Sequence, residues 1–86
     1  MRIRATSHFN RRLSKRVKRN PHLRKKVSKK LKLLTTNIKH PSLELHKLKG
    51  KRIQEYSIWI EGNLRITFQI HKDTILLTDI ITHDEY

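Results

Sequence analysis

Residues 56–70 read YSIWIEGNLRITFQI, and this stretch decides the fold. Apolar side chains recur at every second position on both sides of the EGN sequence at 61–63, which predicts a β-hairpin. We expect its strands over residues 53–60 and 64–70. One face, carrying the isoleucines and Phe68, should pack on a core. The other face is expected to display Ser57, Trp59, Arg65, Thr67 and Gln69.

The sequence that follows the hairpin predicts a third strand in the middle of the sheet. Residues 74–81 read TILLTDII and are nearly all apolar. A strand with neighbours on both sides has this composition. We therefore expect an antiparallel meander of three strands, with a turn at 71–73.

The sequence before the hairpin predicts a short strand and a first helix. Residues 1–5 (MRIRA) alternate apolar and polar side chains, as a strand does. Thr6 or Ser7 can then cap a helix whose apolar face is Phe9, Leu13 and Val17.

A second helix is expected to begin at Asn20-Pro21, because asparagine caps well and proline at the first helical position loses no hydrogen bond. It should end near Thr36 and bury Leu23, Val27, Leu31 and Leu34. Residues 43–48 are expected to be extended. The chain thus predicts one α+β domain over residues 1–86, of order βααβββ, with two basic helices packed on a small, mostly antiparallel, twisted sheet.

The positive charge lies almost entirely in the N-terminal half. Residues 1–43 carry 15 Lys and Arg and no acid, whereas residues 44–86 carry 6 Lys and Arg and all 7 acids. The halves are therefore +15 and −1. Such one-sided charge favours a polyanion or an acidic protein as partner, and we expect RNA. Four lysines of the second helix are the expected ribosomal RNA contacts: Lys25, Lys26, Lys29 and Lys30.

Composition also excludes several classes of site. Without cysteine there is no disulfide, thiolate nucleophile or Cys-based zinc site. No close His/Asp/Glu cluster has ligand spacing, so neither a metal nor another cofactor is expected. No apolar run approaches the roughly 20 residues that span a bilayer, and the N-terminus lacks the apolar stretch of a signal peptide. We therefore expect a cytoplasmic protein with no membrane partner.

The polar and aromatic residues outside the hydrophobic pattern fit RNA cleavage without a metal. That reaction needs a base for the 2′-OH, a cation for the phosphorane-like transition state and an acid for the leaving 5′-oxygen. Histidine suits either proton role, and the planar fork of arginine matches phosphate oxygens. Aromatic rings hold splayed bases. The candidates are His46, Lys47, Lys49, Glu55, Trp59, Arg65, His83 and Tyr86.

Four runs of this sequence together resemble the RelE/ParE superfamily of type II toxin–antitoxin toxins. They are LHKLKG at 45–50, YSI at 56–58, GNLRITF at 62–68 and THDEY at 82–86. The similarity is greatest to the branch of YafQ and the RelE/StbE-type mRNA interferases. It implies a RelE-like fold and a ribosome-dependent endoribonuclease that stops translation and is silenced by a cognate acidic antitoxin.

The resemblance also implies roles for single residues. His46 falls on a catalytic histidine of YafQ-like toxins, and His83 on the C-terminal histidine proposed as general acid. Arg65 matches the arginine that contacts the scissile phosphate, and Tyr86 the C-terminal aromatic that orients the substrate. The YafQ pattern has a second histidine and then an aspartate where this chain has Trp59 and Asn63. The general base is therefore open between His46 and Glu55.

Two other functions remain open at this point. A ParE-type toxin of the same fold would inhibit DNA gyrase by binding it, and would need no acid–phosphate–base set. A non-catalytic protein that binds ribosomal RNA would explain the charge, although not the histidine-rich C-terminal edge.

Overall fold

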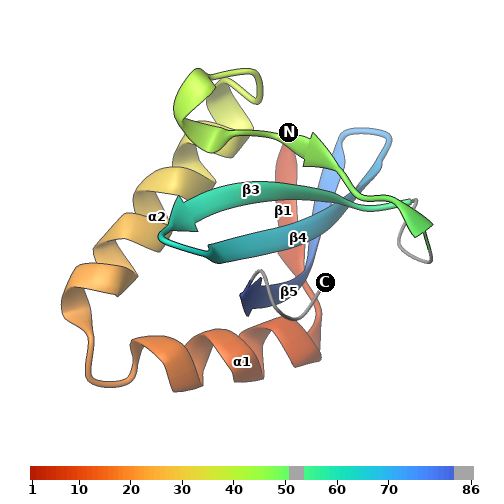
Figure 1. Cartoon of the computed structure of the whole chain (residues 1–86). Coiled ribbons are helices and arrows are strands. Elements are labelled where there is room, and N and C mark those ends of the chain that lie inside the picture. The colour runs from red at the N-terminus through yellow and green to blue at the C-terminus, as the bar shows by residue number, and fades with distance from the viewer. Residues whose placement is uncertain (51–53, 83–86) are drawn as a thin grey trace.

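The computed structural model describes residues 1–50 and 54–82 and shows an α+β fold (Figure 1). Its strands and helices are, in chain order, β1 (Arg2–Ala5), α1 (Ser7–Val17), α2 (Pro21–Thr36), a 3₁₀ turn η1 (Pro41–Leu43), β2 (His46–Lys47), β3 (Tyr56–Glu61), β4 (Leu64–His71) and β5 (Thr74–Thr82). This architecture confirms the predicted fold class. The structure adds the short strand β2 within the segment expected to be extended.

The five strands form one sheet in the order β1-β5-β4-β3-β2. β5 lies between β1 and β4, as its apolar composition predicted. All neighbours are antiparallel except β1, which pairs parallel with β5. Sequence reasoning did not place β1 in the sheet, because its partner lies at the other end of the described chain.

Both helices pack on the same face of the sheet and begin at the predicted caps. The Thr6 hydroxyl accepts a hydrogen bond from the Phe9 N–H, and the Asn20 side chain accepts one from the Leu23 N–H, each at 3.0 Å. Apolar side chains of the helices, η1 and the strands meet in a single core. Leu43 of η1 is fully buried there and anchors the segment that leads to β2.

The opposite face of the sheet is less open than the alternation predicted. Ser57 and Thr67, expected to be displayed there, have no solvent exposure. Ile81 is also buried, and its register partner is Arg65, so the two side chains share this face. Ser57, Thr67 and Ile81 thus form a buried floor beneath this polar face. Residues of neighbouring elements hold the charged side chains around that floor in place. We call this face of the sheet the polar face below.

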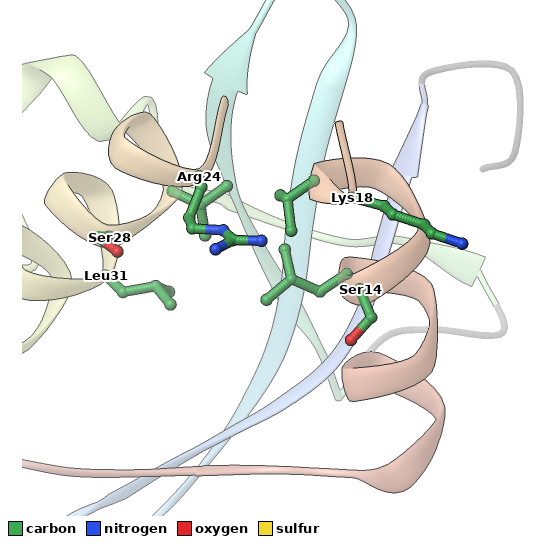
Figure 2. A pocket seen from close by; sticks show the side chains of 8 residues that line it. Ser14, Lys18, Arg24, Ser28 and Leu31 are labelled. Carbon is green, nitrogen blue, oxygen red and sulfur yellow. The ribbon is translucent and has the colours of Figure 1, made fainter. Parts of the chain in front are cut away.

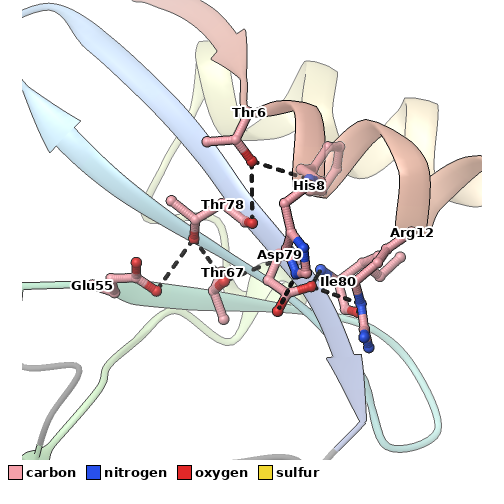
Figure 3. A network of polar contacts seen from close by, with 9 residues as sticks. Thr6, His8, Arg12, Glu55, Thr67, Thr78, Asp79 and Ile80 are labelled. Atoms are coloured by element: carbon pink, nitrogen blue, oxygen red, sulfur yellow. Dashed lines mark hydrogen bonds and ion pairs between the residues drawn. The ribbon is translucent and has the colours of Figure 1, made fainter.

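A bulge in β5 joins the polar face to α1 (Figure 3). The register shifts after Thr67, and Thr78 turns its hydroxyl to that of Thr67 at 2.8 Å. The carboxylate of the next residue, Asp79, forms ion pairs with Arg12 Nε at 2.8 Å and with His8 Nε2 at 3.2 Å. Both partners belong to α1, so this carboxylate ties the helix to the central strand.

We predict that Asp79→Ala destabilises the fold by about 1–3 kcal/mol, because the side chain is only 18% exposed and accepts charge-assisted hydrogen bonds. Asp73→Ala is the matched control, because Asp73 is exposed in the turn before β5 and should cost less than about 0.5 kcal/mol. Urea unfolding of both variants measures the difference. Equal losses would show that the contacts with α1 contribute nothing.

Candidate functional site

Arg65 is a cation of the polar face that two hydrogen bonds hold in place. It projects from β4, and its Nε donates to the Ser57 hydroxyl on β3 at 2.9 Å. Its Nη2 donates to the backbone carbonyl of Glu44, which follows η1, at 2.5 Å. The guanidinium thus links two adjacent strands to the segment that precedes β2.

His46 lies on the same face, one strand further toward the edge. Its register partner is Ser57, and residues directly opposite in a sheet point to the same side. The imidazole is exposed and belongs to a strand of only two residues. The structure therefore brings the predicted histidine and the predicted arginine to one face, where His46 is the register partner of Ser57 and Arg65 is hydrogen-bonded to it.

The two nearby lysines are placed differently from His46. Lys47 pairs with Tyr56, so it points to the other face of the sheet. There it lines a hollow of about 360 Å³ with Gln54, Tyr56 and Ile70. Lys49 is exposed beyond the strand. Neither lysine is part of the Arg65–His46 group as the structure describes it.

Glu55 is held rigidly at the entrance to β3. One carboxylate oxygen accepts from the Thr78 hydroxyl and the other from the Gln69 amide, both at 3.2 Å. Gln69 is in turn hydrogen-bonded to His71 at 2.8 Å. Figure 3 shows how Glu55 continues the polar network of Thr67 and Thr78 across the sheet. The carboxylate is ordered but already serves as an acceptor on both oxygens.

The ring of Trp59 packs against Lys30 of α2. Lys30 Nζ lies 4.8 Å from the centre of its ring, a cation–π distance, and donates to the Ser42 carbonyl at 2.6 Å. The indole N–H donates to the Gly62 carbonyl at 2.8 Å. Burial lowers the pKa of Lys30, while the negative charge of Glu44 opposes this shift.

The four lysines predicted to bind ribosomal RNA fall into two pairs. Lys25 and Lys29 are exposed on α2. Lys26 instead pairs with Glu61 at 3.2 Å, and Lys30 is engaged as described. The spacing of the helix could not show this difference, because the partners come from η1 and β3.

His83 and Tyr86 lie outside the described residues. Within the described ranges 1–50 and 54–82, no group of three or more His, Asp or Glu side chains could hold a metal ion. In the same ranges no helix is long and apolar enough to cross a bilayer.

Sequence reasoning missed two partners of Arg65. The hairpin register pairs Trp59 with Arg65 and Ser57 with Thr67, so Ser57 is the diagonal neighbour of Arg65. That signal was available from the alternation. The carbonyl of Glu44 was not predictable, because it depends on a left-handed backbone conformation (φ 45°, ψ 54°) after η1.

A groove of about 500 Å³ separates α1 from α2 on the helical side of the molecule (Figure 2). Its apolar lining is Leu13, Val17, Val27 and Leu31. Lys18 and Arg24 line it with cationic side chains, and Ser14 and Ser28 complete it. The groove is thus apolar within and positively charged around.

We predict that Lys30→Ala shifts the fluorescence of Trp59 to longer wavelength and increases its quenching by acrylamide, because the lysine no longer covers the ring. Trp59 is the single tryptophan, so the signal has one source. Lys29→Ala, one residue away and exposed, is the matched control and should leave the spectrum unchanged. Identical spectra for the two variants would contradict the packing.

No protein-family model matches the sequence, and no curated protein matches it. Solved structures do. A metal-bound toxin from Helicobacter pylori is 26% identical, with 99% of this chain and 97% of that chain covered and a TM-score of 0.82.

Two further solved structures are similar in fold. A chain of the DinJ–YafQ complex from E. coli is 16% identical, with 99% of this chain and 97% of that one covered and a TM-score of 0.81. A YoeB/ParE toxin from Agrobacterium tumefaciens is 12% identical, with 96% and 99% covered and a TM-score of 0.83. This chain therefore has the α+β fold of YafQ and of the YoeB/ParE-type toxin.

Proposed function

We propose that this protein is the toxin of a type II toxin–antitoxin system and acts in the cytoplasm as a ribosome-dependent mRNA endoribonuclease. The observation that carries the proposal is the group formed by Arg65, Ser57 and His46 on the polar face. A fixed cation and an exposed histidine thus share one sheet face in the nearly neutral half of a strongly basic chain.

The proposed chemistry needs no metal. A base removes the proton of the 2′-OH, whose oxygen attacks the adjacent phosphorus and forms a 2′,3′-cyclic phosphate. The bond to the 5′-oxygen breaks, and an acid supplies the proton for that oxygen. Arg65 stabilises the charge that gathers on the phosphate oxygens.

We assign the proton roles to the histidines. His46 is the first choice for the base, because it is exposed on the face of Arg65. Glu55 is the second choice, since both its oxygens already accept hydrogen bonds. The family resemblance supports His83 as the acid and Tyr86 as the residue that orients the substrate.

We propose that α2 docks the protein on ribosomal RNA through Lys25 and Lys29. Both are exposed, whereas Lys26 and Lys30 are engaged with β3 and η1. Lys49 can add a phosphate contact near the cleavage group. Lys47 has weaker support as an RNA contact, because it points to the face of the sheet opposite Arg65. Trp59 also has weaker support, because Lys30 already packs over its ring.

We further propose an acidic antitoxin as the protein partner. Residues 1–43 hold 15 cations and no acid, so an acidic chain is attracted to both helices. The groove between α1 and α2 offers an apolar floor for one face of an amphipathic segment. The solved DinJ–YafQ complex, in which a chain of this fold occurs with a second protein, supports this partner class.

On translating ribosomes we predict mRNA cuts in the A site, mapped as new 5′ ends. Arg65→Ala and His46→Ala should each slow cleavage by about 100-fold or more, because they remove charge stabilisation and proton transfer respectively. His83→Ala should act similarly. His22→Ala, at the exposed start of α2, is the control and should cut normally.

Two results would overturn this proposal. Intact mRNA with trapped gyrase complexes would identify a ParE-type gyrase inhibitor. Ribosome binding without any cut would identify a non-catalytic RNA-binding protein.

A double charge reversal, Lys25→Glu with Lys29→Glu, should weaken ribosome binding and reduce its salt dependence. Each lost phosphate contact lowers the slope of log K against log salt by about 0.7–0.9. Lys72→Glu, in the exposed turn before β5, is the matched reversal and should bind as the wild type does. Equal binding of all forms at physiological salt would exclude α2 as the docking helix.

A further inference from the structure

We infer that Ser57 and the backbone carbonyl of Glu44 form a clamp that presents one chosen edge of the Arg65 guanidinium to an RNA phosphate. Ser57 is thus a positioning residue, because it would act through Arg65 and not on the substrate. The RNA phosphate as ligand rests on the proposed function. The clamp itself follows from the two hydrogen bonds of Arg65.

The clamp occupies one edge of the guanidinium. A guanidinium has five N–H donors in a rigid fork, and Nε–H points in the same direction as one N–H of Nη2. In Arg65 these two donors go to Ser57 Oγ and to the Glu44 carbonyl. In residues 1–50 and 54–82 no contact of the outer edge, formed by Nη1 and the remaining N–H of Nη2, is found. Its two parallel donors match two oxygens of one phosphate.

Ser57 is suited to this role by its burial. Its side chain has no solvent exposure, so its hydroxyl has to find a partner inside the protein. Arg65 Nε supplies that partner at 2.9 Å. Without the hydroxyl, a partly buried Nε–H would lose its acceptor, and the arginine would be free to take other rotamers.

Glu44 extends the clamp to the predicted histidine. Its N–H donates to the Pro41 carbonyl at 3.1 Å, which closes η1 and turns its own carbonyl toward Arg65. His46 follows two residues later and pairs with Ser57. Ser57 and the Glu44 carbonyl therefore hold the guanidinium of Arg65, and Ser57 also pairs with His46 of β2.

This arrangement makes Arg65→Ala ambiguous as a test of phosphate binding. The substitution removes the cation and also releases the segment before His46. Substitution of Ser57 is cleaner, because it keeps the arginine and its charge and removes only the hydroxyl side of the clamp.

We would test the clamp first without RNA, through the ¹H–¹⁵N NMR signal of the Arg65 Nε–H. The wild type should give a resolved signal that is protected from exchange. Ser57→Ala, which adds no volume to the buried position, should lose that protection. Ser57→Thr keeps the hydroxyl and should restore it, whereas Ser57→Val, of similar shape without the hydroxyl, should not.

The second measurement is single-turnover cleavage on programmed ribosomes. Ser57→Ala and Ser57→Val should cut about 10- to 100-fold more slowly than the wild type, with ribosome affinity unchanged. Ser57→Thr should cut at close to the wild-type rate. Urea unfolding shows whether Ser57→Thr and Ser57→Val are as stable as the wild type. If they are not, the cleavage rate of Ser57→Ala alone tests the positioning role.

The outcomes separate this inference from the proposed function. An Nε–H signal that is equally protected in Ser57→Ala overturns the clamp, whatever the protein does to RNA. Loss of protection with wild-type cleavage rates overturns the positioning role. Absence of cleavage by the wild type overturns the proposed function and the phosphate role together, and the NMR result then decides the clamp alone.

Discussion

The structure depends on the pairing of β5 along both of its edges. This strand has an antiparallel partner in β4 along its length and a parallel partner in β1 over its first half, and beyond β1 the side chains of Thr6 and Arg12 donate to its carbonyls. Its buried side chains, among them Ile75, Leu77 and Ile80, form the part of the core on which α1 packs. Its bulge then directs Thr78 into the polar face and Asp79 to α1. One strand thereby fixes the sheet, the first helix and the floor of the candidate site.

The acids in the part of the chain that the structure describes act locally and leave most of the positive charge unneutralised. Glu61 pairs with Lys26 and Asp79 with Arg12, so each anchors a cation of a helix to a strand. Glu55 accepts hydrogen bonds from the Gln69 amide and the Thr78 hydroxyl, which links β3 to β4 and β5. The remaining exposed cations of the helices keep their charge available to a partner. The positions of Glu61 and Asp79 therefore decide that Lys26 and Arg12 hold the fold, whereas Lys25 and Lys29 stay exposed.

Local sequence signals predicted most of the fold. The Thr6 and Asn20 caps, the hairpin turn and the apolar run at 74–81 depend on neighbours within a few residues, so their structure follows from local chemistry. The β3 strand was expected from residue 53 but begins at Tyr56. The parallel position of β1 was beyond reach, because no local signal selects between distant partners.

For the candidate site, the alternation of β3 and β4 predicted that Arg65 and Trp59 share a face, and the register agrees. The burial of Ser57 and Thr67 and the engagement of Lys30 were not predicted. Each depends on groups from another element, such as the bulge at Thr78 or the Ser42 carbonyl. The left-handed conformation of Glu44 was equally hidden, since glutamate has no special preference for it.

The pairing of β1 with β5 has a consequence for the nascent chain. The hydroxyl of Thr6, directly after β1, donates to the carbonyl of Thr78, 72 positions later. β1 emerges from the ribosome early and must wait for β5, while the helices between them can already form turns. β1 can join the sheet only after β5 has been synthesised, because β5 lies between β1 and β4. Before that, β3 and β4 lack the strand that completes their sheet. The toxin proposed above would thus lack a complete sheet on the ribosome that makes it until nearly all of its described residues have been synthesised.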